Sequence, residues 1–254
     1  MTKKIVTGFV IFLMTAACNK LNNSTSVGNV IHSLKTDSSQ TLADGTGLVH
    51  VSVILDSLAT SDRSGVLFRL NTGNFAGTAA ANAADTTEVV QAQFVGNSLV
   101  ASAVVQVPQT PGWLIISAQP NVTQMMNNNN YILKDSVRLL PSVPDSVYLT
   151  ASSAGIASNY GSQVTLTGVL FNSLRGKVSL GYSVAFGDSL QGPVYAGGYW
   201  VSMVDTSNAT SQVSGIYSIG PGSVGTPITI TCTVLDSTGK KTSVSGSTLI
   251  YINK

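Results

Sequence analysis

Hydrophobic and polar residues alternate with a period of two along most of this chain. The segment LVHVSVILD carries apolar side chains on one face of an extended strand, namely Val49, Val51, Val53 and Leu55. The alternation recurs in GVLFRL, residues 65–70, and in PITITCTVLD, residues 227–236. Strands with this pattern bury one face and typically form antiparallel sheets. Because no convincing helical spacing follows the first seventeen residues, the pattern predicts an all-β protein.

The alternating segments also repeat at a distance of one domain. TPGWLIISA, residues 110–118, aligns with TPITITCTV, which begins 116 residues later. The same offset aligns Val66, Phe68 and Leu70 with Tyr182, Val184 and Phe186. A period of this length is domain-sized, and the prolines of LPSVP, residues 140–144, interrupt a strand ladder. We therefore predict two tandem β-sandwiches, residues 29–141 and 142–254.

The N-terminus has the three parts of a secretory signal. Lys3 and Lys4 precede an apolar run, residues 5–14, and the small residues Thr15 to Ala17 follow. Ten helical residues rise about 15 Å, half the thickness of a hydrocarbon core, so this run is too short to span a membrane. We predict a signal peptide over residues 1–17 and, in the polar stretch that follows, a flexible tether over residues 18–28.

The end of the signal, MTAACNK, resembles the lipobox of bacterial lipoproteins, in which the cysteine thiol receives a diacylglyceryl group and the new α-amine is acylated. The usual motif has Leu where this chain has Thr15. The resemblance implies a lipid anchor at Cys18, with two or three acyl chains that hold the chain stably to a membrane. It places the protein in the cell envelope of a Gram-negative bacterium, at the outer membrane, on its periplasmic face or its surface. The alternative is an ordinary signal peptide with an incidental cysteine.

Both predicted sandwiches contain segments that resemble bacterial Ig-like domains of the invasin and intimin class. LADGTGLVHVSVILD followed by GVLFRLNTG is similar to their opening strands, and ITCTVLDSTGKKTS is similar to their penultimate strand and hairpin. The second domain has Ser158 to Gly161, SNYG, in place of Ala-Asp-Gly. The resemblance implies Ig-like antiparallel β-sandwiches that act as rigid spacers or adhesive modules and share no active site.

Charge is scarce in this chain. Charged residues make up 9% of the sequence, and removal of Lys3 and Lys4 with the signal leaves eleven basic and eleven acidic residues. A near-neutral chain without a basic stripe argues against a nucleic-acid partner. Acylation of Cys18 would leave Cys232 without a disulfide partner, and its alternation with Ile230 predicts that it is a small buried apolar residue.

Residues for catalysis or metal binding are sparse and scattered. The chain has two histidines, His32 and His50, and a single glutamate, Glu88. GPGSVG, residues 220–225, fits the glycine pattern of a dinucleotide loop but leads into an alternating strand instead of a helix, which indicates a turn. We therefore expect no enzyme, cofactor or metal site, with a glycosidase built from distant carboxylates as an alternative.

Aromatic residues are the better candidates for contact with a ligand or partner. Tyr195, Tyr199 and Trp200 crowd into GPVYAGGYW, where the glycines would leave rings free to lie against a sugar. The alternative is that these rings fill the core and that the glycines mark a bulge or turn.

Trp113 lies on the strand face opposite Leu114. With Ile115, it would either cover a domain interface or, if exposed, mark a partner site.

A short motif built on aspartate is over-represented. Six aspartates are each followed by Ser or Thr and then by an aliphatic residue or Thr. The pattern resembles an O-glycosylation motif of some Gram-negative bacteria, which makes these residues the candidate acceptors: Ser57, Thr86, Ser136, Ser146, Ser189 and Ser237. Turn chemistry at strand ends explains the pattern equally well.

Two functions are consistent with these features. The leading hypothesis is a non-enzymatic envelope lipoprotein that presents two Ig-like modules for adhesion, protein interaction or structural spacing. The alternative is a glycan-binding accessory lipoprotein of a carbohydrate-uptake system. The expected partners are the membrane, through Cys18, and an unidentified protein or glycan.

Overall fold

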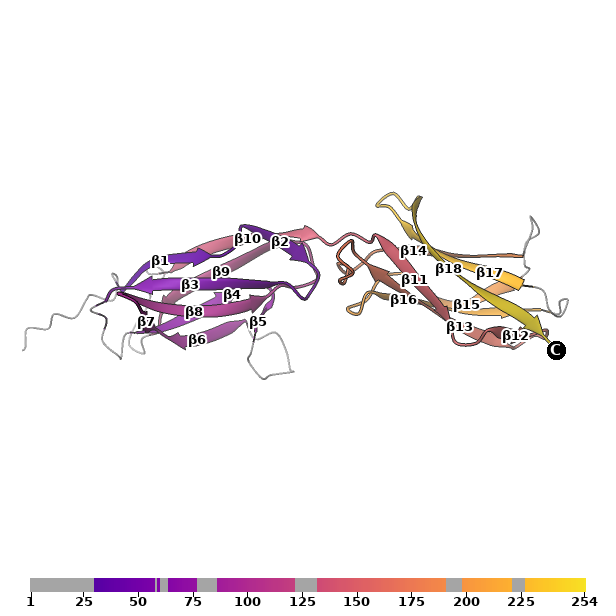
Figure 1. Cartoon of the computed structure of the whole chain (residues 1–254), viewed down its shortest axis with the longest axis horizontal. Coiled ribbons are helices and arrows are strands. Elements are labelled where there is room, and N and C mark those ends of the chain that lie inside the picture. The colour runs from indigo at the N-terminus through magenta and orange to yellow at the C-terminus, as the bar shows by residue number, and fades with distance from the viewer. Residues whose placement is uncertain are drawn as a thin grey trace, which may run out of the picture.

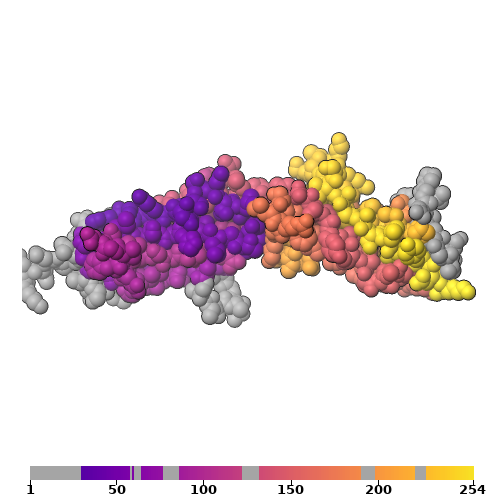
Figure 2. All heavy atoms as spheres, in the orientation of Figure 1, coloured from indigo at the N-terminus to yellow at the C-terminus, as the bar shows by residue number. Residues whose placement is uncertain are grey.

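A computed structural model describes residues 30–57, 59, 64–76, 86–121, 132–190, 198–220 and 227–254. These residues form strands and loops, in four sheets that pair into two sandwiches. The sandwiches follow one another along the long axis of the molecule (Figure 1), and the space-filling view shows them in contact end to end (Figure 2). The described part of the chain contains no helix that is long and apolar enough to cross a membrane.

The first sandwich packs two five-stranded sheets face to face. One sheet has the order β1 (Ile31–Thr36), β3 (Leu48–Leu55), β8 (Ser98–Gln106) and β5 (Asn74–Phe75), with β7 (Gln93–Val95) also paired to β8. The other has the order β2 (Gln40–Ala43), β10 (Leu133–Pro141), β9 (Gly112–Pro120), β4 (Gly65–Leu70) and β6 (Thr87–Gln91).

The second sandwich packs two four-stranded sheets. One has the order β11 (Ser146–Ala151), β13 (Gln163–Phe171), β16 (Gln212–Ile219) and β15 (Gly198–Val204). The other has the order β12 (Gly155–Ala157), β18 (Lys241–Asn253), β17 (Pro227–Leu235) and β14 (Val184–Leu190). In chain order these are the A-B-E-D and C-F-G sheets of an immunoglobulin domain, with one short extra strand. The predicted all-β, Ig-like architecture is confirmed.

The short extra strand pairs in parallel in both sandwiches. β2 runs parallel to β10, and β12 runs parallel to β18, whereas the other ladders between named strands are antiparallel. The predicted antiparallel sandwiches are therefore confirmed, and each has one short parallel pair at a sheet edge. Period-two alternation reports which face of a strand is buried, and it carries no information on the direction of the neighbouring strand.

The core of each sandwich is formed by the inward faces of its strands. In the first, Val49, Phe68 and Ile116 have no solvent exposure. In the second, Ile230 is equally buried, on a strand equivalent to the one that carries Ile116. The segments related by the sequence repeat are β3 and β13, β4 and β14, and β9 and β17, which occupy equivalent positions in the two sandwiches.

Cys232 is a fully buried free thiol in the second core, as the alternation predicts. It faces Gly168 of β13 on the opposite sheet, where an added Cβ would lie 3.4 Å from the Cys232 sulfur and 2.9 Å from Val213. The glycine therefore leaves the space that the Val213 side chain occupies, and the sulfur lies at ordinary contact distance. Burial raises the pKa of the Cys232 thiol to about 12.

This burial predicts a stability that depends on pH. The folded thiol stays protonated to about pH 12, whereas the unfolded thiol ionises near its ordinary value of 9.0. The contribution of this group is therefore complete below pH 9.0 and decreases as the pH rises towards 12, because ionisation favours the unfolded chain. Denaturant titrations of a Cys18→Ser chain between pH 8 and 11 should show this loss, and the same chain with Cys232→Ala should lack it. An equal loss in both chains would contradict the prediction.

Candidate functional site

An aromatic cluster lies between the sheets of the second sandwich, at the edge formed by β14 and β15. The Trp200 ring is 5.1 Å from Phe186 of β14 and 5.0 Å from Tyr217 of β16, measured between ring centroids. Tyr217 is fully buried and Trp200 is half-buried against the same core. The structure therefore supports the alternative reading for Trp200, in which the ring fills the core.

Tyr199 lies on the opposite face of β15 from Trp200. Trp200 pairs with the buried Tyr217, and Tyr199 pairs with Ser218, because successive strand residues point to opposite faces. Tyr199 is 45% exposed. The two rings therefore form no common platform, and contact by Tyr199 alone stays a prediction. Tyr195 lies outside the described residues.

A hydrogen bond inside this cluster joins the two sheets. The Tyr217 hydroxyl on β16 donates to the Asp188 carboxylate on β14 at 2.6 Å. Gly198 makes room for the phenol, because an added Cβ would overlap the Tyr217 oxygen. The bulge in β15 falls between Trp200 and Ser202 and not at the glycine, so close packing is the role of Gly198.

Trp113 and Ile115 project from the outer face of β9, in the first sandwich. Trp113 is 56% exposed and Ile115 is 41% exposed, whereas Leu114 between them is fully buried. The backbone around the pair is held by Asn71, whose amide donates to the Trp113 carbonyl and accepts from the Ile115 N–H. The second sandwich therefore does not cover the pair, and contact with a partner at Trp113 stays a prediction.

The candidate glycosylation acceptors are at the surface. Five are exposed, and Thr86 is half-buried. Asp236 stabilises a turn at the end of β17, as the alternative explanation of the motif predicts. Hydrogen bonds from Thr238 and from the Lys240 N–H hold its carboxylate and lower its pKa. Asp188 and Asp135, however, lie within strands. Turn chemistry therefore explains only part of the pattern, and modification stays a prediction.

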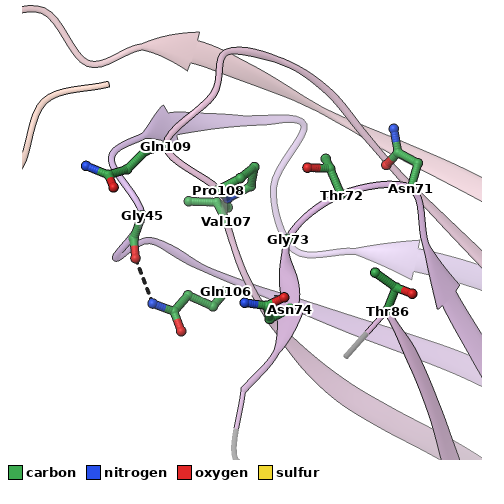
Figure 3. A pocket seen from close by; sticks show the side chains of 10 residues that line it. All are labelled: Gly45, Asn71, Thr72, Gly73, Asn74, Thr86, Gln106, Val107, Pro108 and Gln109. Atoms are coloured by element: carbon green, nitrogen blue, oxygen red, sulfur yellow. Dashed lines mark hydrogen bonds between the residues drawn. The ribbon is translucent and has the colours of Figure 1, made fainter. Parts of the chain in front are cut away.

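A pocket of about 400 Å³ lies at the end of the first sandwich that meets the second (Figure 3). Uncharged polar side chains dominate its lining, among them Asn71, Thr72, Asn74, Thr86, Gln106 and Gln109. The side chain of Gln106 donates to the Gly45 carbonyl at 2.6 Å and so ties two lining loops together. A lining of amides and hydroxyls without charge suits a ligand rich in hydroxyl groups. Sequence reasoning missed this pocket because its residues come from four separate segments.

The sandwiches are joined by a buried polar network around the linker residue Ser142. Its N–H donates to the Ser179 hydroxyl at 2.9 Å, and its hydroxyl donates to the Lys177 carbonyl at 2.8 Å. Asn172 donates to the Ser142 hydroxyl at 2.9 Å. Ser142, Asn172 and Ser179 are all buried. The linker is therefore fixed to the loop between β13 and β14.

The same loop of the second sandwich also binds the first. The Ser179 hydroxyl donates to the Ala43 carbonyl at the end of β2, at 2.7 Å. Gln109 donates its side-chain amide to the Val178 carbonyl and accepts the Leu180 N–H on its own carbonyl. Three hydrogen bonds thus cross directly from one sandwich to the other.

A second pocket, of about 580 Å³, flanks the linker on the second sandwich. Its lining is largely apolar and includes Val143, Pro144, Tyr182, Val234 and Val244. Burial raises the pKa of the Tyr182 hydroxyl. Ser183, Asp236, Ser237 and Thr242 also line it, and the side chains of Asp236 and Thr242 already form hydrogen bonds within the β17–β18 hairpin. The pocket therefore points to no particular ligand chemistry.

The histidines and acidic residues do not converge on a centre. The described residues contain no group of three His, Cys, Asp or Glu side chains that could hold a metal ion. His32 lies 3.8 Å from the Asp56 carboxylate, and His50 is an exposed residue of β3. The loop of residues 221–225 lies outside the described part of the chain.

No family model matches this chain, and no curated protein matches it. Among solved structures, the adhesin InvE of Yersinia pseudotuberculosis is 15% identical with a TM-score of 0.44, over 91% of this chain and 62% of that one. The D00-D0 domain of Intimin is 11% identical with a TM-score of 0.33, over 87% of this chain and all of that one. A glycosyl hydrolase family 2 member from Bacteroides cellulosilyticus is 15% identical with a TM-score of 0.34, over 86% of this chain and 24% of that one. This chain therefore spans less than two thirds of InvE. At these scores the similarities carry no argument about function.

The hydrogen bond between the sheets predicts a specific cost of mutation. Tyr217→Phe keeps the buried ring but leaves the half-buried Asp188 carboxylate without this donor, so the free energy of unfolding should fall by about 1–3 kcal/mol. Urea titrations followed by Trp fluorescence measure the change. Tyr199→Phe is the matched control on an exposed ring and should leave stability unchanged within about 0.5 kcal/mol. Equal stability of Tyr217→Phe and the parent chain would refute the role of this bond.

Proposed function

We propose that this chain is a non-enzymatic envelope protein that presents two Ig-like modules as one rigid rod, for adhesion or structural spacing. The observation that carries the proposal is the buried network at the joint. Two modules connected by a free linker would rotate independently, whereas here Ser179 is bonded to both the linker and the first sandwich. A rigid rod holds its outer faces at a defined distance and orientation from its point of attachment.

The energetics of the joint support rigidity. Bending at the joint would break several of these hydrogen bonds and leave buried groups without a partner. Each buried group left in this way would raise the free energy of the bent form by about 1–3 kcal/mol. Inter-domain motion is the default expectation when an interface is small and solvated. In this chain Ala43, Ser142 and Ser179 are almost completely buried, which excludes the water that would replace their bonds.

Glycan binding is a second candidate function. The pocket beside Gln106 and Gln109 supports it, since hydroxyl and amide groups without charge suit sugar hydroxyls. The aromatic platform expected from Tyr199 and Trp200 no longer contributes, because the rings point to opposite sides of β15. Presentation of a glycan site on a rigid module is compatible with the first proposal.

We also infer that Cys18 carries the lipid that attaches the rod to a membrane. With a short polar tether after it, residues 18–28, the first sandwich would lie close to that membrane and the second would extend beyond it. The Asp-Ser and Asp-Thr motifs would place glycans along the rod. Both inferences rest on the sequence resemblances, and both change the mass of the protein.

The joint predicts that both modules tumble together. In NMR relaxation measurements on the whole chain, amides of both sandwiches should fit a single rotational diffusion tensor. Ser179→Ala removes the donor to Ala43 and the acceptor for the Ser142 N–H, and it should produce two separate tensors while each core stays folded. Ser173→Ala, an exposed serine in the same loop, is the matched control and should behave like the parent. Independent tumbling in the parent chain would refute the rigid rod.

The anchor predicts the mass of the mature protein. Protein purified from its native host should lack residues 1–17 and carry acyl chains on Cys18, and Cys18→Ala should release it from the membrane fraction. Mass spectrometry of proteolytic fragments then tests the acceptors Ser57, Thr86, Ser136, Ser146, Ser189 and Ser237 one at a time. Unmodified fragments would remove the glycosylation hypothesis, and an unacylated N-terminus would remove the anchor.

A further inference from the structure

The outer face of the β10–β9–β4 sheet carries three cations around two exposed apolar side chains. The cations are Arg69, Lys134 and Arg138. Ile115 lies between them and Trp113 lies beside Arg138, and these five residues are called the basic face below. We propose that the basic face binds an acidic polysaccharide. The inference rests on the proposed presentation function and names the class of partner that one face of the rod would take.

The register of the sheet places these side chains together. Arg138 pairs directly with Trp113 across β10 and β9, and Lys134 pairs with Ser117, which in turn pairs with Arg69 of β4. With neighbouring strands about 4.8 Å apart, the backbones of Lys134 and Arg69 are about 10 Å apart. Four residues along β10 separate Lys134 from Arg138 by about 13 Å. Lys134 and Arg69 therefore flank Ser117 on one side of Ile115, and Arg138 lies beside Trp113 on the other side.

These cations have no acidic partner in the described structure. The only ion pair within 4.0 Å among described residues joins His32 to Asp56, on the other sheet. Asp135 is adjacent to Lys134 in sequence, but its carboxylate is turned the other way and accepts the N–H and hydroxyl of Thr36, each at 2.9 Å. In a chain with only 9% charged residues, three unpaired cations on one sheet face form a distinct positive surface.

Glu88 of β6 does not lie on the basic face either. It pairs with Phe68, whose side chain is completely buried, so the glutamate lies on the inward side of the sheet. The outward residues of β6 are Thr87, Val89 and Gln91. Among described residues, no carboxylate therefore projects from this face.

Hydrogen bonds from Asn71 hold the backbone that carries the exposed Trp113 side chain. Asn71 bonds the carbonyl of Trp113 at 2.9 Å and the N–H of Ile115 at 2.6 Å, and Leu114 anchors the strand in the core. An indole that is more than half exposed on a regular strand gives up favourable burial, which marks such rings as candidate contact sites. The ring can meet a ligand without prior rearrangement of the strand.

The chemistry of the face favours an acidic polysaccharide. Pyranose rings have a flat apolar side that packs on an indole, and uronate or sulfate groups accept charge-assisted hydrogen bonds from Arg and Lys. An open sheet face accommodates an extended chain whose charges are spaced along it. Nucleic acid requires neutralisation of many phosphates, which three cations on a near-neutral protein cannot supply. A membrane contact requires a continuous apolar surface. Here Ser117 and Ser136 lie directly beside Ile115, so the apolar surface of this face is small and bordered by polar residues.

One of the candidate glycosylation acceptors lies inside this surface. Ser136 pairs with Ile115, at the centre of the basic face. A glycan on Ser136 would cover the face, so the binding experiment uses recombinant full-length chain whose mass shows no sugar at Ser136.

The test is isothermal titration of the full chain in detergent with alginate, a polymer of uronic acids, and with dextran as the neutral comparison. We expect saturable binding of alginate that weakens with salt, and no binding of dextran. Trp113→Ala and the double variant Lys134→Gln with Arg138→Gln should each weaken binding at least about tenfold, as for central contacts in an interface. Circular dichroism verifies that these surface variants fold.

Lys241→Gln, an exposed cation on the second sandwich, is the matched control and should leave alginate binding unchanged. Absence of alginate binding overturns the proposal, and so does an equal loss of binding in the Lys241→Gln control. Binding that Trp113→Ala leaves unchanged also overturns it, because it would show simple ion exchange. Binding to vesicles of phosphatidylglycerol but not to alginate would show a membrane contact and overturn it as well. The rigid rod is judged independently, because the NMR tensors of the two sandwiches do not depend on any ligand.

Discussion

Burial of one face of every long strand is the constraint on which both sandwiches depend. A sheet of alternating residues is unstable alone, and only a second sheet of the same kind covers its apolar face. Val49, Phe68 and Ile116 meet that requirement in the first core, and Ile230 and Tyr217 meet it in the second. Once the inner faces are committed, the outer faces are free to carry other residues. The exposed indole of Trp113 and the cations of the basic face are tolerated because the opposite side of the same strands is anchored in the core.

The second core satisfies the same constraint less simply than the first. Its edge contains a phenol and a carboxylate, and the Tyr217–Asp188 hydrogen bond lets the phenol be buried and the carboxylate half-buried at low cost. Two glycines complete it. Gly168 leaves space for the Val213 side chain, and Gly198 lets the Tyr217 oxygen approach β15. Of the two adjacent aromatic residues of β15, Trp200 therefore packs inside the sandwich and Tyr199 lies on its outer face.

The sequence predicted the parts of the structure that depend on local pattern. The inward faces of β3, β4, β9 and β17, and the burial of Cys232, follow from period-two alternation. Two features depend on non-local geometry and could not be read in this way. The parallel pairing of β2 with β10 is set by where the chain crosses between sheets, and the pocket in Figure 3 assembles side chains from separate loops. The basic face lies between these cases, because alternation exposes Trp113 but only the register places Arg138 beside it.

The joint between the two sandwiches depends on contacts that the linker sequence alone does not reveal. The two prolines of LPSVP indicate a break between ladders, and a semi-rigid spacer was the most that their chemistry could imply. The hydrogen bonds that support a rigid joint come instead from Ser142 between the prolines, which is bonded by Asn172 and Ser179 from a loop about thirty residues further on. That loop needs Arg175 in a left-handed conformation, with φ of 58°, to turn back on the linker. Because Ser179 also donates a hydrogen bond to Ala43, a rigid joint would hold the basic face in one orientation relative to the second sandwich through a few buried hydroxyl groups.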